Sequence, residues 1–91
     1  MSASDDHLDQ LLEFPCEFTF RVVAKHRDDL SEWCQHKVEQ ALGRPVDRVQ
    51  LQPSRAGAYS AVRVVATVHE PAEVRRAYGA LGALEGLKML L

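Results

Sequence analysis

Gln52-Pro-Ser-Arg-Ala-Gly-Ala-Tyr-Ser-Ala-Val-Arg-Val-Val-Ala-Thr-Val68 decides the fold, because it predicts a tight turn that leads into the longest β-strand of the chain. Pro53 suits a strand end, and Gly57 can adopt the positive φ that a reversal requires. The Val-rich run that follows has the residue types and the period of a strand, with one mostly apolar face and one face that carries Arg63. The apolar face consists of Ser60, Val62, Val64, Ala66 and Val68.

A shorter strand precedes the turn, where Val49 and Leu51 alternate with polar residues. The two strands predict a β-hairpin with a loop of four or five residues. A further strand is expected over 16–24, with Phe18, Phe20 and Val22 on one side, and a last short strand over 87–91.

Two amphipathic helices are expected between the strands. The first begins near Asp28 or Asp29, has Trp33 as its bulkiest core contact, and ends at Gly43. The second begins at Pro71, where the missing N–H costs nothing. Its apolar stripe is Val74, Ala77, Tyr78 and Leu81, and Glu73, Arg75 and Arg76 are expected to face water.

The predicted order is therefore strand, helix, strand, strand, helix, strand. This order is typical of a ferredoxin-like α+β sandwich, in which a four-stranded antiparallel sheet carries both helices on one face. The handedness rule for crossovers places the first and third strands in the centre of the sheet.

Composition indicates one small domain. The chain has 91 residues and a formal net charge of −2, and an acidic tail over 1–9 precedes a single domain over 10–91. Since Asp5, Asp6 and Asp9 contribute three negative charges, the remainder sums to +1, so we expect no nucleic-acid partner. No run is apolar enough for a membrane span, the N-terminus is unlike a secretory signal, and free thiols fit a cytoplasmic protein.

Catalytic and cofactor chemistry is not indicated. Cys16 and Cys34 stand 18 positions apart, and the four histidines are scattered, so no metal-ligand spacing is present. Cys34 falls on the apolar stripe of the first helix, where a buried thiol is inert. The outward positions of the central strands lack the aromatic residues that stack on RNA bases. We therefore expect no enzyme, no metal and no cofactor.

One group of cations suggests a contact surface. Arg21, Arg63 and Lys88 are all predicted on the helix-free face, with Val23, Val65 and Leu90 as its apolar part. The face either carries ordinary solvated charges, matched by Glu17, or contacts an acidic partner or a second copy.

A family resemblance adds to this interpretation. Leu11-Leu-Glu-Phe-Pro15 before Phe18-Thr-Phe20, Pro53-Ser-Arg-Ala-Gly-Ala-Tyr-Ser60 before the Val-rich strand, and the ending around Tyr78-Gly79 and Leu87-Lys-Met-Leu-Leu91 resemble the YbeD-like (UPF0250, DUF493) bacterial proteins. The resemblance covers 8–91 and implies an ACT-like ferredoxin fold, without transferable catalytic residues. By analogy with ACT domains it also implies a regulatory role.

The expected function is a non-enzymatic regulatory or adaptor module that binds a partner protein or a small metabolite. A ligand loop is expected at the start of the first helix, with His26, Arg27 and Asp28. The alternative function is self-association, as a homodimer formed through the open sheet face or an edge strand.

Overall fold

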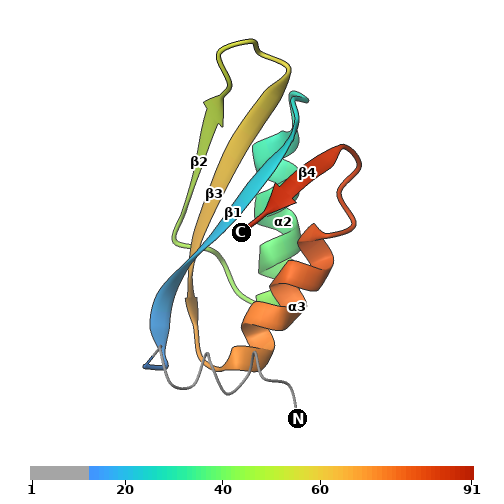
Figure 1. The fold of residues 1–91 in the computed structure, drawn as a ribbon. Coiled ribbons are helices and arrows are strands. Elements are labelled where there is room, and N and C mark those ends of the chain that lie inside the picture. Colours follow the sequence, from blue (N-terminus) through green and yellow to red (C-terminus); the bar gives the residue numbers. More distant parts are fainter. Residues whose placement is uncertain (1–12) are drawn as a thin grey trace.

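The computed structural model describes residues 13–91, which form four strands and two helices (Figure 1). The predicted tail over 1–9 and the first residues of the predicted domain lie outside the described residues. The elements follow the predicted order: β1 (Cys16–Lys25), α2 (Leu30–Leu42), β2 (Arg48–Pro53), β3 (Tyr59–Val68), α3 (Pro71–Leu81) and β4 (Leu87–Leu90).

The four strands make one antiparallel sheet in the order β2-β3-β1-β4. The prediction that the first and third strands are central is thereby confirmed. Ten residues of β1 pair with ten of β3, from Cys16 opposite Val68 to Lys25 opposite Tyr59. The loop between β2 and β3 spans 54–58, and Gly57 has a φ of 74° there, as the turn requires.

Both helices cover the same face of the sheet (Figure 1), so the ferredoxin-like α+β sandwich is confirmed. The inward face of β1 and β3 is closed to solvent because each strand places alternate residues against the helices. The fully buried strand residues are Phe20, Val22, Ala24, Val62, Val64, Ala66 and Val68.

Helix α2 contributes one continuous apolar stripe, formed by Leu30, Cys34, Val38 and Leu42. It ends at Gly43, which is left-handed and donates its N–H to the carbonyl of Glu39. Trp33 packs against the core, as predicted, but it is only half-buried, at the margin. The reason is its position one residue outside the stripe.

Helix α3 begins at Pro71, as predicted, and places Tyr78 against the phenylalanines of β1. The Tyr78 ring centroid lies 5.2 Å from that of Phe20 and 6.1 Å from that of Phe18, with tilted to perpendicular planes. Such edge-to-face geometry is favoured between aromatic rings. These contacts hold α3 against β1.

An ion pair joins the end of α2 to the start of α3, and it corrects the expectation that Glu73 faces water. Glu73 is buried, and its carboxylate accepts hydrogen bonds from Arg44 Nη2 at 2.6 Å and Nη1 at 3.1 Å. The same guanidinium donates to the carbonyl of Thr67 at 2.6 Å, and Glu73 also accepts from the His69 N–H at 2.8 Å. The pair therefore ties α2, the end of β3 and α3 together.

We predict that Glu73→Gln lowers the free energy of unfolding by about 2 kcal/mol, because it leaves the Arg44 charge without its carboxylate. Glu70→Gln is the matched control, since the Glu70 side chain makes no capping hydrogen bond. Urea denaturation of both variants checks this, and equal stability of the two would contradict the role given to the ion pair.

We further predict an acid-dependent contribution from this carboxyl. The hydrogen-bonded Arg44 lowers the pKa of Glu73 from 4.5 to about 2, against the smaller opposing effect of burial. A lowered folded-state pKa gives stability that is present above pH 4.5 and is lost as the pH falls towards 2. Denaturation curves across this pH range should show less loss of stability in Glu73→Gln than in the native protein.

Candidate functional site: the open face of the sheet

The face of the sheet opposite the helices carries an uneven distribution of charge. Its outward positions hold several cations but few carboxylates, those of Glu17 on β1 and of Asp47, which accepts a hydrogen bond from Thr67 Oγ1 at 3.1 Å. The Glu17 carboxylate lies 3.6 Å from Arg48 of β2. The cations on this face are Arg21, Lys25, Arg48, Arg63 and Lys88.

Arg21 and Arg63 stand directly opposite each other on the two central strands. Within residues 13–91 neither guanidinium forms an ion pair or a side-chain hydrogen bond. The idea that Glu17 matches these charges is not supported, since its described partner is Arg48. The prediction that Arg21 and Arg63 share the helix-free face on neighbouring strands is confirmed.

Lys88 reaches the same face but interacts with an aromatic ring. Its Nζ lies 4.4 Å from the ring centroid of Tyr59, which is paired with Lys25 at the far end of β3. The Val23–Ala61 pair separates this row from the Arg21–Arg63 row. The three predicted cations therefore form two groups, one on each side of an apolar row.

A register irregularity in β4 corrects the expectation for Leu90. Pairing shifts between Val23 and Ala24, so that Met89 stands opposite Val23 and Leu90 stands opposite the buried Val22. A bulge reverses the alternation of side chains beyond it. Leu90 therefore packs against the core, whereas Met89 is 46% exposed beside Val23.

Val65 lies on the open face, opposite Thr19 and Arg48, but it is only 5% exposed. It can contribute little contact area to a partner. Leu91 can contribute more contact area than Val65, because it is 58% exposed. Its backbone pairs with that of Arg21, which places it on the same face. The apolar part of the face therefore consists of Val23, Ala61, Met89 and Leu91.

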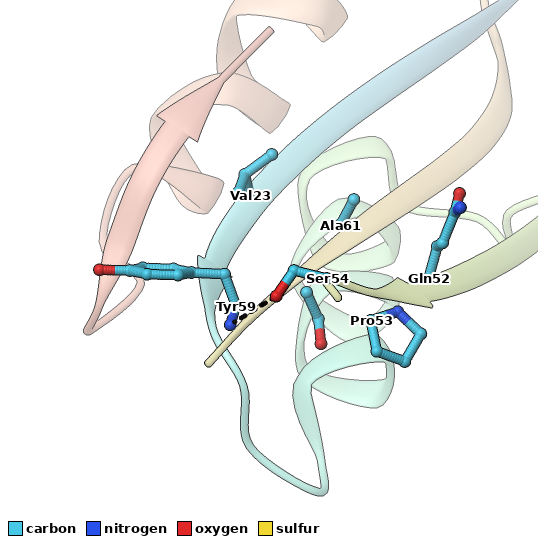
Figure 2. Close-up of a pocket in the computed structure, with 7 residues that line it drawn as sticks. Val23, Gln52, Pro53, Ser54, Tyr59 and Ala61 are labelled. Carbon is cyan, nitrogen blue, oxygen red and sulfur yellow. Dashed lines mark hydrogen bonds between the residues drawn. The ribbon is translucent and has the colours of Figure 1, made fainter. Parts of the chain in front are cut away.

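A shallow hollow of about 210 Å³ lies on this face beside the hairpin (Figure 2). Val23, Ala61 and Tyr59 form its strand side, and Gln52 and Pro53 its β2 side. Figure 2 shows the Tyr59 ring extending toward β4, and Ser54 Oγ accepting a hydrogen bond from the Tyr59 N–H. No local pattern in the sequence predicts this hollow, because it arises from small or short side chains on adjacent strands.

The predicted ligand loop satisfies much of its own hydrogen bonding. Arg27 donates two hydrogen bonds to Asp29, at 2.5 and 2.8 Å, and this contact raises the pKa of the guanidinium. His26 Nδ1 lies 2.8 Å from the hydroxyl oxygen of the buried Ser60, and His26 Nε2 lies 3.9 Å from the exposed Asp28. Asp29 occupies the N-cap position without a side-chain capping bond, because its carboxylate binds Arg27.

A shallow, open depression of about 430 Å³ adjoins this loop and is lined by Lys25, His26, Arg27, Glu85 and Gly86. Two features of this depression disfavour the binding of an anion. Arg27 already binds a carboxylate, and Glu85 contributes a negative charge to the rim. The hydroxyl of Ser60 lies within hydrogen-bond distance of His26, but Ser60 is buried and is therefore not accessible to a ligand.

Among residues 13–91, the buried thiol of Cys34 is unreactive and no cluster of metal ligands is found. Burial raises the pKa of the Cys34 thiol to about 11, which keeps it protonated at neutral pH. No group of three or more potential metal ligands comes together among residues 13–91. Within these residues, neither helix has the length and apolarity needed to cross a bilayer.

Comparisons with known proteins agree with the resemblance seen in the sequence. The model of the family described as "Protein of unknown function (DUF493)" matches residues 9–91. A UPF0250 protein of Shewanella loihica is 34% identical over 90 residues, which cover 96% of this chain and 98% of the relative. A UPF0250 protein of Yersinia pestis is 35% identical over 85 residues, covering 92% and 95%.

A solved structure shows the same fold. The solution structure of protein HP0495 from H. pylori is similar with a TM-score of 0.74 and 17% sequence identity. The match covers 88% of this chain and 85% of that protein. At this identity the likeness concerns the fold alone.

We predict that iodoacetamide at pH 8 modifies Cys16 in the native protein and reaches Cys34 only after unfolding. Cys16 is half-buried at the start of β1, whereas Cys34 is buried and its pKa is raised. Peptide mass spectrometry with and without urea measures this. Rapid alkylation of Cys34 in native buffer would contradict the assignment of this thiol to the core.

Proposed function

We propose that this chain, which belongs to the DUF493 (UPF0250) family of small bacterial proteins, is a non-enzymatic adaptor or regulatory domain that binds an acidic partner protein through its open sheet face. We place it in the cytoplasm, where its two free cysteines stay reduced. The observation that carries the proposal is the excess of cations around an exposed apolar row on this face.

The charge on this face contrasts with that of the whole chain. The protein has a formal net charge of −2, yet the open face presents five cations against the two carboxylates of Glu17 and Asp47. Complementary potentials of this kind speed association and select partners of opposite charge. The apolar row through Val23, Ala61 and Met89 gives such a partner surface to bury.

A protein partner fits this surface better than a small metabolite. Both hollows are shallow and open to solvent, whereas pockets for small molecules usually enclose most of the ligand. A nucleic acid fits poorly, because Tyr59 is the only aromatic residue described on the open face and Lys88 covers its ring. A thermal-shift screen with amino acids and nucleotides is expected to leave the melting temperature unchanged.

We predict that reversing three charges, Arg21→Glu, Arg63→Glu and Lys88→Glu together, reduces partner capture about tenfold or more. Quantitative mass spectrometry of affinity-purified complexes from the host cytosol measures the effect. The charge-matched control reverses Lys37, Arg55 and Arg75, which lie on α2, the hairpin loop and α3. Equal loss in both triple variants, with both folded by circular dichroism, would contradict a specific role for the open face.

Self-association is the second candidate function, and the free edge of β2 favours it. Leu51 is 41% exposed although it stands opposite the buried Val62, because the helices do not cover the outer end of this edge strand. Antiparallel pairing of two β2 strands about Gln50 would set Val49 opposite Leu51 of the second copy and would bring no like charges together.

If the β2 edge joins two copies, Leu51→Lys lowers the sedimentation coefficient at high protein concentration to that of a monomer. Leu91→Lys is the matched control, since this exposed leucine lies beside β1, at the opposite side of the sheet. Loss of association in Leu91→Lys alone would instead indicate a dimer through the open face. A monomer at all concentrations in the native protein would rule out this second function.

A further inference from the structure

We propose that Arg21 and Arg63 together bind one carboxylate of the partner, and that the adjacent hollow takes an apolar side chain from the same segment. This inference rests on the proposed function and specifies the chemistry that the open face recognises. The occupant is an acidic protein segment that presents a carboxylate and an apolar side chain toward the sheet.

The pairing of Arg21 with Arg63 is unfavourable for the stability of the protein when no anion is bound. Arg21 and Arg63 are paired residues on neighbouring strands, and like charges in that position repel. The two carboxylates described on this face have other partners, since Glu17 lies beside Arg48 and Asp47 accepts a hydrogen bond from Thr67. An anion bound between Arg21 and Arg63 would relieve this repulsion, which no carboxylate among residues 13–91 offsets by an ion pair.

A carboxylate is the group that fits this pair. The planar guanidinium donates parallel hydrogen bonds that match the two oxygens of a carboxylate, and charge-assisted bonds of this type are the strong ones. Gln50 stands opposite Arg63 on β2 and adds a neutral amide beside the pair. The row therefore offers donors from three adjacent strands.

The hollow lies at a fixed distance from this row. Val23 and Ala61 are two residues along β1 and β3 from Arg21 and Arg63, which corresponds to about 7 Å along the strands. Side chains at i and i+2 of an extended segment have about this spacing, and side chains at i and i+4 of a helix lie about 6 Å apart. One short segment can therefore fill both places.

The first test is the stability of the free protein. Arg63→Gln removes the repulsion and should raise the melting temperature by about 2 °C. Arg48→Gln is the control, because it removes a cation that faces Glu17 and should not raise the melting temperature. An unchanged or lower melting temperature in Arg63→Gln would overturn the claim that these charges are uncompensated.

The second test locates the partner segment. Benzoylphenylalanine in place of Met89, which is exposed beside Val23, should cross-link to a partner in host cells, and mass spectrometry then gives the linked peptide. We expect an Asp or Glu within four residues of the linked position. Combined Arg21→Gln and Arg63→Gln should lower the cross-link yield about tenfold, and Arg48→Gln should leave it unchanged.

Each remaining outcome separates this inference from the proposed function. Cross-links that persist undiminished in the Arg21→Gln, Arg63→Gln variant would overturn the carboxylate site and leave the face as a partner surface. Linked peptides without an acidic residue would likewise overturn the carboxylate site. The absence of any cross-link at position 89 would overturn both the carboxylate site and the partner surface. A cross-link to a second copy of this chain would instead indicate self-association in place of an acidic partner.

Discussion

The antiparallel pairing of β1 with β3 determines the rest of the structure. Because side chains alternate along a strand, a single register places Phe20 opposite Val64 on one face and Arg21 opposite Arg63 on the other. A slip by one residue would bury the arginines and expose the core. The apolar packing that holds the helices therefore also forces two cations together on the open side, and the proposed binding surface is a consequence of the core.

The helical side depends on a polar contact as well as on apolar burial. Arg44 binds Glu73 and the carbonyl of Thr67, so one guanidinium fixes the end of α2, the end of β3 and the first turn of α3. The helices can thus stay on one face while the other remains accessible. The sheet in this way separates the residues that stabilise the fold from those of the proposed binding surface.

The sequence predicted most of this arrangement because its strongest signals are local. Alternation in the valine-rich strand and the glycines Gly43 and Gly57 act over a few residues, and they placed Val62, Gly43 and Arg63 correctly. The bulge that turns Leu90 inward depends on pairing between distant strands, and the Arg44–Glu73 pair joins residues 29 positions apart. No local pattern carries such information.

Nuclear magnetic resonance of the isotope-labelled protein in concentrated host cytosol tests the central claim most directly. Binding through the open face predicts signal broadening and shifts confined to Arg21, Val23, Arg63 and Met89 and their neighbours on the sheet, with α2 and α3 unaffected. Broadening centred on α2 and α3, or a spectrum identical to that in buffer, would contradict the account.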